Sequence, residues 1–130
     1  MARNPSPHPT ELEFEILKIL WSRGPSTVRE VREELADFRE LAHTSVMTTM
    51  TIMTKKGYLA RKKEGMGYVY RTKIEESSTK RKMVSDMVDR AFEGSASALL
   101  LNLLEKEKIS GDELDALRKL IDQKSREERQ

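Results

Sequence analysis

Apolar positions recur at helical spacing through the first half of the chain. Residues 11–23 carry two apolar stripes on opposite sides of a predicted helix, made of Leu12, Ile16, Ile19 and Leu20, and of Phe14, Leu17 and Trp21. A helix that is exposed along one face would carry a single stripe. We therefore expect this helix to be covered on both sides, by the rest of its own domain and by a C-terminal element or a second subunit.

Two more helices are predicted before residue 57. The first extends to about Asp37 and buries one face, consisting of Val28, Val31 and Leu35. The second starts near Thr44 and buries Val46, Met50 and Met53. It ends at Gly57, where glycine suits a left-handed backbone. Capping boxes mark two of the helix starts. Thr10 and Glu13 precede the helix of residues 11–23, and Thr27 and Glu30 precede the helix that extends to about Asp37.

After residue 57 the pattern changes to that of strands. Residues 58–63 and 68–73 are predicted to pair as a hairpin through Glu64-Gly65-Met66-Gly67, with glycines where a positive φ is expected. Three helices followed by a hairpin are the layout of a winged helix-turn-helix domain. We predict this domain over residues 10–75, preceded by a Pro-rich disordered tail over residues 1–9.

The rest of the chain is predicted to be helical, with an interruption at Glu93-Gly94-Ser95 and a capping box at Ser110 and Glu113. Its short helices hold too many leucines to bury by themselves, so we expect them to pair with the same segment of a second copy. We predict a helical dimerisation domain over residues 76–123 and a frayed C-terminus over residues 124–130. The expected dimer contacts are Met87, Phe92, Leu99, Leu100, Leu103, Leu104, Leu114, Leu117 and Ile121. The predicted fold class is mostly α with a small β-hairpin.

The charge distribution predicts that the winged-helix domain binds DNA. Between His43 and Lys73, seven basic residues stand against Glu64 alone, whereas the whole chain has a net charge of +2. A helix in the major groove reads base edges with its first turns, and a basic hairpin neutralises phosphates. The predicted DNA contacts are Thr44, Ser45, Met47, Thr48, Thr51, Lys55, Lys56, Arg61, Lys62, Lys63 and Arg71. A plainer interpretation also exists, in which the hydroxyls cap the helix and the basic hairpin is only a solvated face.

Composition argues against several other classes of protein. The chain has no cysteine, which excludes disulfides, thiolate metal sites and a cysteine nucleophile. The only histidines, His8 and His43, allow neither a histidine pair nor a Ser-His-Asp arrangement, so we predict no enzyme, metal or cofactor. No apolar run is long enough for a membrane span, and Met1–Pro9 lacks the apolar part of a signal peptide. We expect a cytoplasmic protein without membrane insertion.

Four segments between about residues 10 and 122, taken together, are characteristic of one protein family. They are ELEFEILKILW, STVREVREEL, HTSVMTTM…KKGYLARKKEGMGYVYR and AFEGSASALLLNLLEKEKISGDELDALRKLI. Together they resemble the penicillinase and methicillin-resistance repressors of bacteria, the BlaI/MecI type. The resemblance implies a homodimeric winged-helix repressor that binds an operator dyad of TACA/TGTA type upstream of its own operon. It also implies induction by a membrane sensor-metalloprotease that causes cleavage at Asn102-Leu103.

The chain departs from that family pattern in three places. Ile52 occupies a position of the third predicted helix that commonly holds arginine, and Met66-Gly67 stands where a basic residue is frequent in the hairpin. Both departures imply an altered operator contact. The family's copper-responsive branch carries cysteines near its C-terminus, and their absence excludes copper sensing through thiolates.

Two alternatives to a DNA-binding repressor stay open from the sequence. One is a winged-helix module that binds another protein, against which the concentration of basic residues argues. The other is a winged-helix regulator inactivated by direct binding of a small ligand, which would need a polar-lined pocket.

Overall fold

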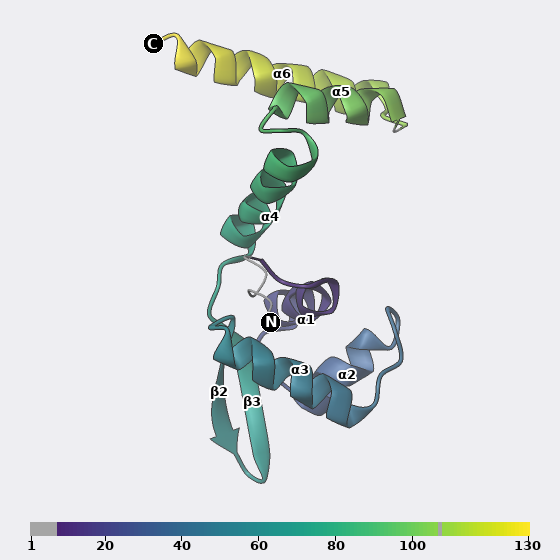
Figure 1. Ribbon diagram of the computed structural model, residues 1–130, viewed down its shortest axis with the longest axis vertical. Helices are drawn as coiled ribbons and strands as arrows, with labels where there is room; N and C mark the ends of the chain where they lie inside the picture. The colour runs from purple at the N-terminus through teal and green to yellow at the C-terminus, as the bar shows by residue number, and fades with distance from the viewer. Residues whose placement is uncertain (1–7, 107) are drawn as a thin grey trace. The chain divides into compact units, whose positions relative to one another are not determined.

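The computed structural model describes residues 8–106 and 108–130, which divide into two compact units between Val84 and Ser85. Figure 1 labels the elements along the chain. The first unit holds α1 (Glu11–Arg23), β1 (Ser26–Thr27), α2 (Val28–Leu35), α3 (His43–Lys55), β2 (Leu59–Glu64), β3 (Gly67–Thr72) and the start of α4 (Glu76–Ala91). The second unit holds the end of α4, α5 (Ala96–Lys106) and α6 (Gly111–Glu128). Helices followed by a small sheet confirm the predicted fold class.

Local side-chain chemistry sets the helix ends where the sequence predicts them. Thr10 Oγ1 accepts a hydrogen bond from Glu13 N at 3.2 Å, and Thr10 N donates to Glu13 Oε1 at 2.9 Å. Thr27 and Glu30 repeat both bonds at the same distances. Ser110 Oγ accepts from Glu113 N at 3.1 Å at the start of α6. These bonds satisfy amide groups that a helix leaves without partners in its first turn.

The end of α3 is a Schellman turn built on Gly57. Its φ is +86°, a left-handed conformation that glycine adopts without steric cost. Tyr58 N donates to Met53 O at 2.9 Å, and Gly57 N donates to Thr54 O at 3.1 Å. This turn directs the chain from α3 straight into β2, and so fixes the hairpin beside the helix.

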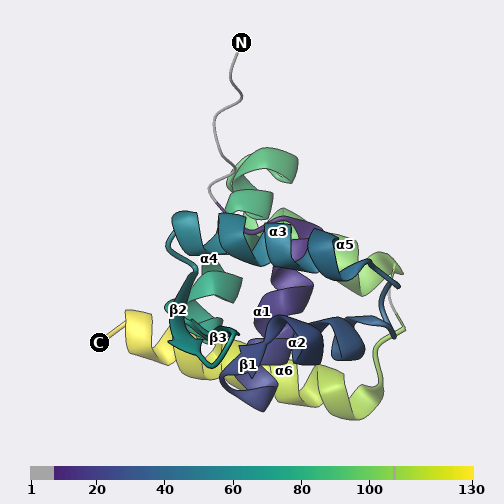
Figure 2. The same cartoon turned by 90° about the horizontal axis from the view of Figure 1, so that it is seen from below.

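The sheet is antiparallel with strand order β1-β3-β2, and Figure 2 shows α1, α2 and α3 gathered beside it. Glu64 pairs with Gly67, so only Gly65 and Met66 form the hairpin turn, which is shorter than predicted. Strand β1 was not predicted, because two residues are too short to show a period. It is held through Ser26, which pairs with Tyr70, is fully buried and donates its hydroxyl to Gly24 O at 2.9 Å.

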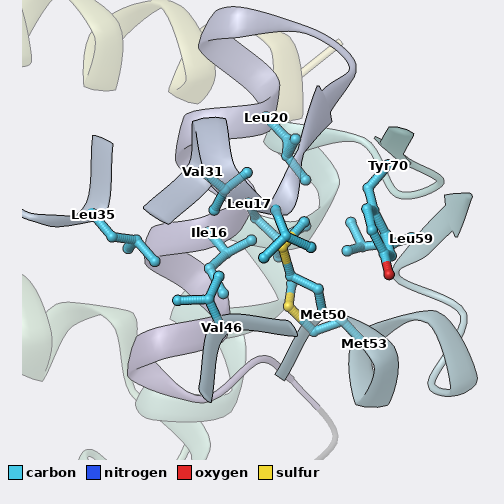
Figure 3. Packing of buried hydrophobic residues seen from close by; sticks show 11 residues of the cluster. Ile16, Leu17, Leu20, Val31, Leu35, Val46, Met50, Met53, Leu59 and Tyr70 are labelled. Atoms are coloured by element: carbon cyan, nitrogen blue, oxygen red, sulfur yellow. The ribbon is translucent and has the colours of Figure 1, made fainter. Parts of the chain in front are cut away.

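One hydrophobic core lies between the three helices and the sheet of the first unit (Figure 3). Its members are Ile16, Leu17, Leu20, Val28, Val31, Leu35, Val46, Met50, Met53, Leu59 and Tyr70. The second side of α1 is partly covered by the segment between β3 and α4 of the same unit, where the sequence suggested a C-terminal element or a second subunit. Trp21 Nε1 donates to Ile74 O at 3.1 Å there, and the Trp21 ring meets Phe14 edge to face.

The predicted boundaries need correction at both ends. Residues 1–7 of the predicted tail lie outside the described residues, but Pro9 is buried and borders the same hollow as Tyr58 and Ile74. The compact units meet inside α4 rather than at residue 75. Helix α6 continues to Glu128, five residues past the predicted end at residue 123. The extension consists of good helix formers, and Lys124 pairs with Glu128 one turn later at 3.5 Å.

Candidate nucleic-acid interface

Helix α3 is anchored by one face and presents the other to solvent. Val46, Met50 and Met53 are completely buried in the core, which fixes the rotation of the helix about its axis. The side chains left on the outer face are Thr44, Ser45, Met47, Thr48, Ile52 and Lys55, with Thr51 half-buried at its edge. The structure therefore brings the predicted base-reading residues together on one exposed surface.

The outer hydroxyls of α3 do not cap the helix. Its N-cap residue is Ala42, which has no side-chain capping bond. Within the described part of the chain, the hydroxyls of Thr44, Ser45 and Thr48 make no hydrogen bond, so they are free to meet a ligand. Thr51 differs, because its Oγ1 donates to Met47 O at 2.8 Å within the helix. Its hydroxyl can still accept a bond but has less freedom to reorient.

The hairpin of β2 and β3 places most of its charge in open solvent. Lys62, Lys63 and Arg71 are exposed, as is Lys55 at the end of α3. Among residues 8–106 and 108–130, none of these four has an ion-pair partner. Exposed cations without a salt bridge are suited to phosphate groups, because no internal ion pair must be broken on binding.

Arg61 is held in place by two tyrosines. Its guanidinium lies 4.2 Å from the centre of the Tyr68 ring, a cation–π contact. A hydrogen bond to Tyr70 is the main cause that raises the pKa of Arg61 above its ordinary value. Tyr68 and Tyr70 thus pack within the hairpin, and they fix the orientation of one cation on its surface.

Lys56 has a different position from the other predicted DNA contacts. Its Nζ lies 3.0 Å and 2.9 Å from the two carboxylate oxygens of Glu13, whose side chain is only 4% exposed. The same carboxylate caps α1 through Thr10. Lys56 therefore ties the end of α3 to the start of α1, and we reassign it from phosphate contact to structural ion pair.

The structure adds residues that sequence reasoning missed. A groove of about 400 Å³ separates α3 from the hairpin, and it is lined by Thr27, Val28, Arg29, His43, Met47, Glu64, Met66, Gly67, Tyr68 and Tyr70. Arg29 on α2 borders this groove with a side chain that is 83% exposed, although its Nε also lies 3.3 Å from Glu33. One sequence signal could have identified Arg29 as a site residue: it lies in the first turn of α2, the helix that precedes α3.

The comparison with protein families decides the relationship. A family model described as the penicillinase repressor matches residues 9–123. The chain belongs to this penicillinase repressor family. The members are repressors, and the prediction of a transcriptional repressor rather than an enzyme is thereby confirmed.

Individual members of the penicillinase repressor family are similar over most of their length. The methicillin resistance regulatory protein MecI of Mammaliicoccus sciuri is 30% identical over 112 residues, covering 86% of this chain and 91% of its own. The penicillinase repressor of Bacillus licheniformis is 27% identical over 117 residues, covering 90% and 91%. The solved DNA-binding domain of the repressor BlaI is 29% identical with a TM-score of 0.50, covering 58% of this chain and 92% of that domain.

The described residues offer neither a metal site nor a membrane-spanning helix. No group of three His, Cys, Asp or Glu side chains there is placed to hold a metal ion. None of the described helices combines the length and apolar character needed to cross a bilayer.

Proposed function

We propose that this chain is a homodimeric repressor that binds an inverted-repeat operator in double-stranded DNA and acts in the bacterial cytoplasm. The observation that carries the proposal is the combination of exposed, unbonded hydroxyls on α3 with exposed, unpaired cations on the hairpin that follows it. The likeness of this unit to the BlaI DNA-binding domain supports the same assignment.

The contacts divide into two kinds with different consequences. Thr44, Ser45 and Thr48, together with the methyl group of Met47, face the base edges in the major groove and set sequence preference. Lys55, Lys62, Lys63 and Arg71 bind phosphates and set affinity and register without reading sequence. We expect half-sites of the TACA/TGTA type, altered where Ile52 replaces a cation that the family commonly carries.

The second unit supplies the proposed dimer interface. Helix α6 has no buried residue along its 18 positions, and Leu101, Leu120 and Ile121 are 58%, 61% and 57% exposed. Of these three, only Ile121 was among the predicted contacts. The remaining predicted contacts are exposed at Met87, Leu100, Leu103, Leu104 and Leu114, and half-buried at Phe92, Leu99 and Leu117. Soluble proteins rarely leave so many leucines in water, so pairing with a second copy removes them from solvent.

Induction by proteolysis fits the same unit. Asn102 and Leu103 both lie exposed within α5. Cutting between them separates residues 103–130, including all of α6, from the DNA-reading unit. We propose that a membrane sensor-metalloprotease, or a protease that it activates, makes this cut and so releases the operator.

Selection of bound duplexes from random DNA by the purified full-length protein tests the proposal. We expect an inverted repeat with half-sites about one helical turn, roughly 34 Å, apart, as a two-fold dimer requires. Substitution of both Lys62 and Lys63 with alanine should weaken every duplex alike and reduce the salt slope by about 0.9 per lost phosphate contact. Salt-sensitive binding without any enriched repeat would contradict operator recognition.

A further inference from the structure

The tip of the hairpin carries an apolar side chain that the fold does not use. Met66 has an exposed fraction of 103%, the largest of the exposed hydrophobic residues that the structure describes. It lies in the two-residue turn that joins β2 to β3, and Figure 1 shows this turn at the free end of the hairpin. A methionine chain is long, unbranched and flexible, so it adapts to irregular apolar surfaces.

The glycines on both sides make this tip thin. Gly65 needs its positive φ of +61° for the tight turn. Gly67 has no such requirement, and a Cβ added at either glycine would meet no atom within 4 Å. Packing inside the protein therefore does not explain Gly67. Met66 is therefore the only residue of Gly65-Met66-Gly67 that carries a side chain.

The groove beside the tip indicates where that group would lie on DNA. One wall of the groove comes from α3 through His43 and Met47, and the opposite wall comes from the hairpin through Met66 and Tyr68. With α3 in the major groove, the adjoining sugar-phosphate strand has its place in this groove. The hairpin tip then lies on the far side of that strand, where the minor groove opens.

Charge at the tip argues against a phosphate contact there. Glu64 also lines the groove and repels phosphate, whereas the cations Lys62, Lys63 and Arg71 lie farther along the strands. Arg29 and His43 face the groove from the opposite side and can hold the strand that passes through it. The tip itself thus offers an apolar group, while the phosphate contacts come from its surroundings.

We propose that Met66 enters the minor groove beside each half-site and discriminates there against G·C pairs; this inference rests on the proposed operator binding. Acceptor atoms line the minor-groove floor of every base pair, but only G·C adds the guanine N2 amino group. That group projects into the floor of the groove, and a methionine that covers it offers a poor partner in place of water. At A·T pairs the side chain reaches deeper and buries more of its surface against the sugar walls.

The test uses an operator duplex recovered by the selection described above. The base pairs beneath the hairpin tip are changed from A·T to G·C, and then to inosine·C, which keeps the G·C major groove but lacks the N2 amino group. For the unaltered protein we expect G·C to weaken binding about tenfold and inosine·C to restore it, a change that corresponds to burial of most of one methionine side chain. Met66→Ala should bind all three duplexes with the weaker affinity.

A matched variant separates this effect from general loss of binding. Lys62→Ala should weaken all three duplexes by one common factor and keep the tenfold ratio. Met66→Ala should also melt at the same temperature as the unaltered protein, because the side chain packs against nothing. A ratio that survives in Met66→Ala, or no ratio in the unaltered protein, overturns the proposal. Failure to select any duplex would instead remove the operator binding on which it rests.

Discussion

Lys55 and Lys56 are adjacent in sequence, yet the structure gives them opposite roles. Lys55 is exposed and unpaired, whereas Lys56 neutralises the buried carboxylate of Glu13. Substituting each lysine with methionine removes one charge from the same turn and keeps much of the side-chain volume. The pair therefore forms a matched experiment on what each cation does.

The expected loss of stability follows from the burial of Glu13. Removing one partner of a buried ion pair typically costs about 3–5 kcal/mol, because the other charge stays buried and unpaired. Lys56 is itself 25% exposed, so water can partly replace it, and the lower end of the range, about 3 kcal/mol, applies. For a unit of this size Lys56→Met should lower Tm by about 10–20 °C. Lys55→Met should change Tm by no more than about 2–4 °C, as for an ordinary surface substitution.

The two substitutions should affect DNA binding in the opposite order, with a loss for Lys55→Met and none for Lys56→Met. At a temperature where both variants are folded, Lys55→Met should reduce the slope of log affinity against log salt by about 0.9, as one lost phosphate contact predicts. Lys56→Met should leave that slope unchanged. Thermal melts at one fixed protein concentration and titrations at several salt concentrations provide the two readouts.

A second substitution keeps the reasoning testable if Lys56→Met folds poorly. Adding Glu13→Gln removes the stranded negative charge while keeping an acceptor for Thr10 N, so the double variant should regain most of the lost stability. The reasoning is refuted if Lys56→Met melts normally and lowers the salt slope by one contact, since Lys56 would then be a phosphate ligand.

Three further predictions concern other parts of the chain. Thr48→Ala should change sequence preference by about 1–3 kcal/mol between the selected operator and its half-site variants; an equal loss on scrambled DNA would contradict a base contact. Truncation after Asn102 should give a folded monomer by sedimentation, and a fragment that remains dimeric would place the interface elsewhere. The pKa of Glu30 lies below its ordinary 4.5, chiefly through the bond from the Thr27 backbone, so its stabilising effect is present above pH 4.5 and lost as the pH falls further. Glu30→Gln should therefore flatten the acid limb of an unfolding curve, and an unchanged limb would show that Glu30 does not contribute.

Features that depend on neighbouring residues in the sequence were predictable. The capping boxes at Thr10 and Thr27 and the turn at Gly57 each involve groups no more than five residues apart, and the structure contains all three. The buried face of α3 was also predictable, because apolar residues spaced three and four positions apart lie on one face of a helix.

Features that depend on distant pairs were not predictable in this way. The bond between Lys56 and Glu13 joins residues 43 positions apart, and nothing near Lys56 distinguishes it from Lys55. Strand β1 exists only through its pairing with β3, in which Ser26 lies opposite Tyr70, 44 positions away in the sequence. A two-residue strand has no period of its own. Long-range contacts decide which of several similar lysines or serines becomes structural, and only the fold reveals them.

The division of the chain explains how cleavage can end repression without damage to the reading surface. Every residue of the hydrophobic core described here lies between Ile16 and Tyr70, and α5 and α6 contribute none of them. A cut after Asn102 therefore leaves the core of the first unit complete. What the proposed dimer loses is the link between two such units, and with it the effective concentration that makes the second half-site bind. In the proposed mechanism, each released unit keeps its intrinsic preference for a half-site but holds it too weakly to exclude the transcription machinery.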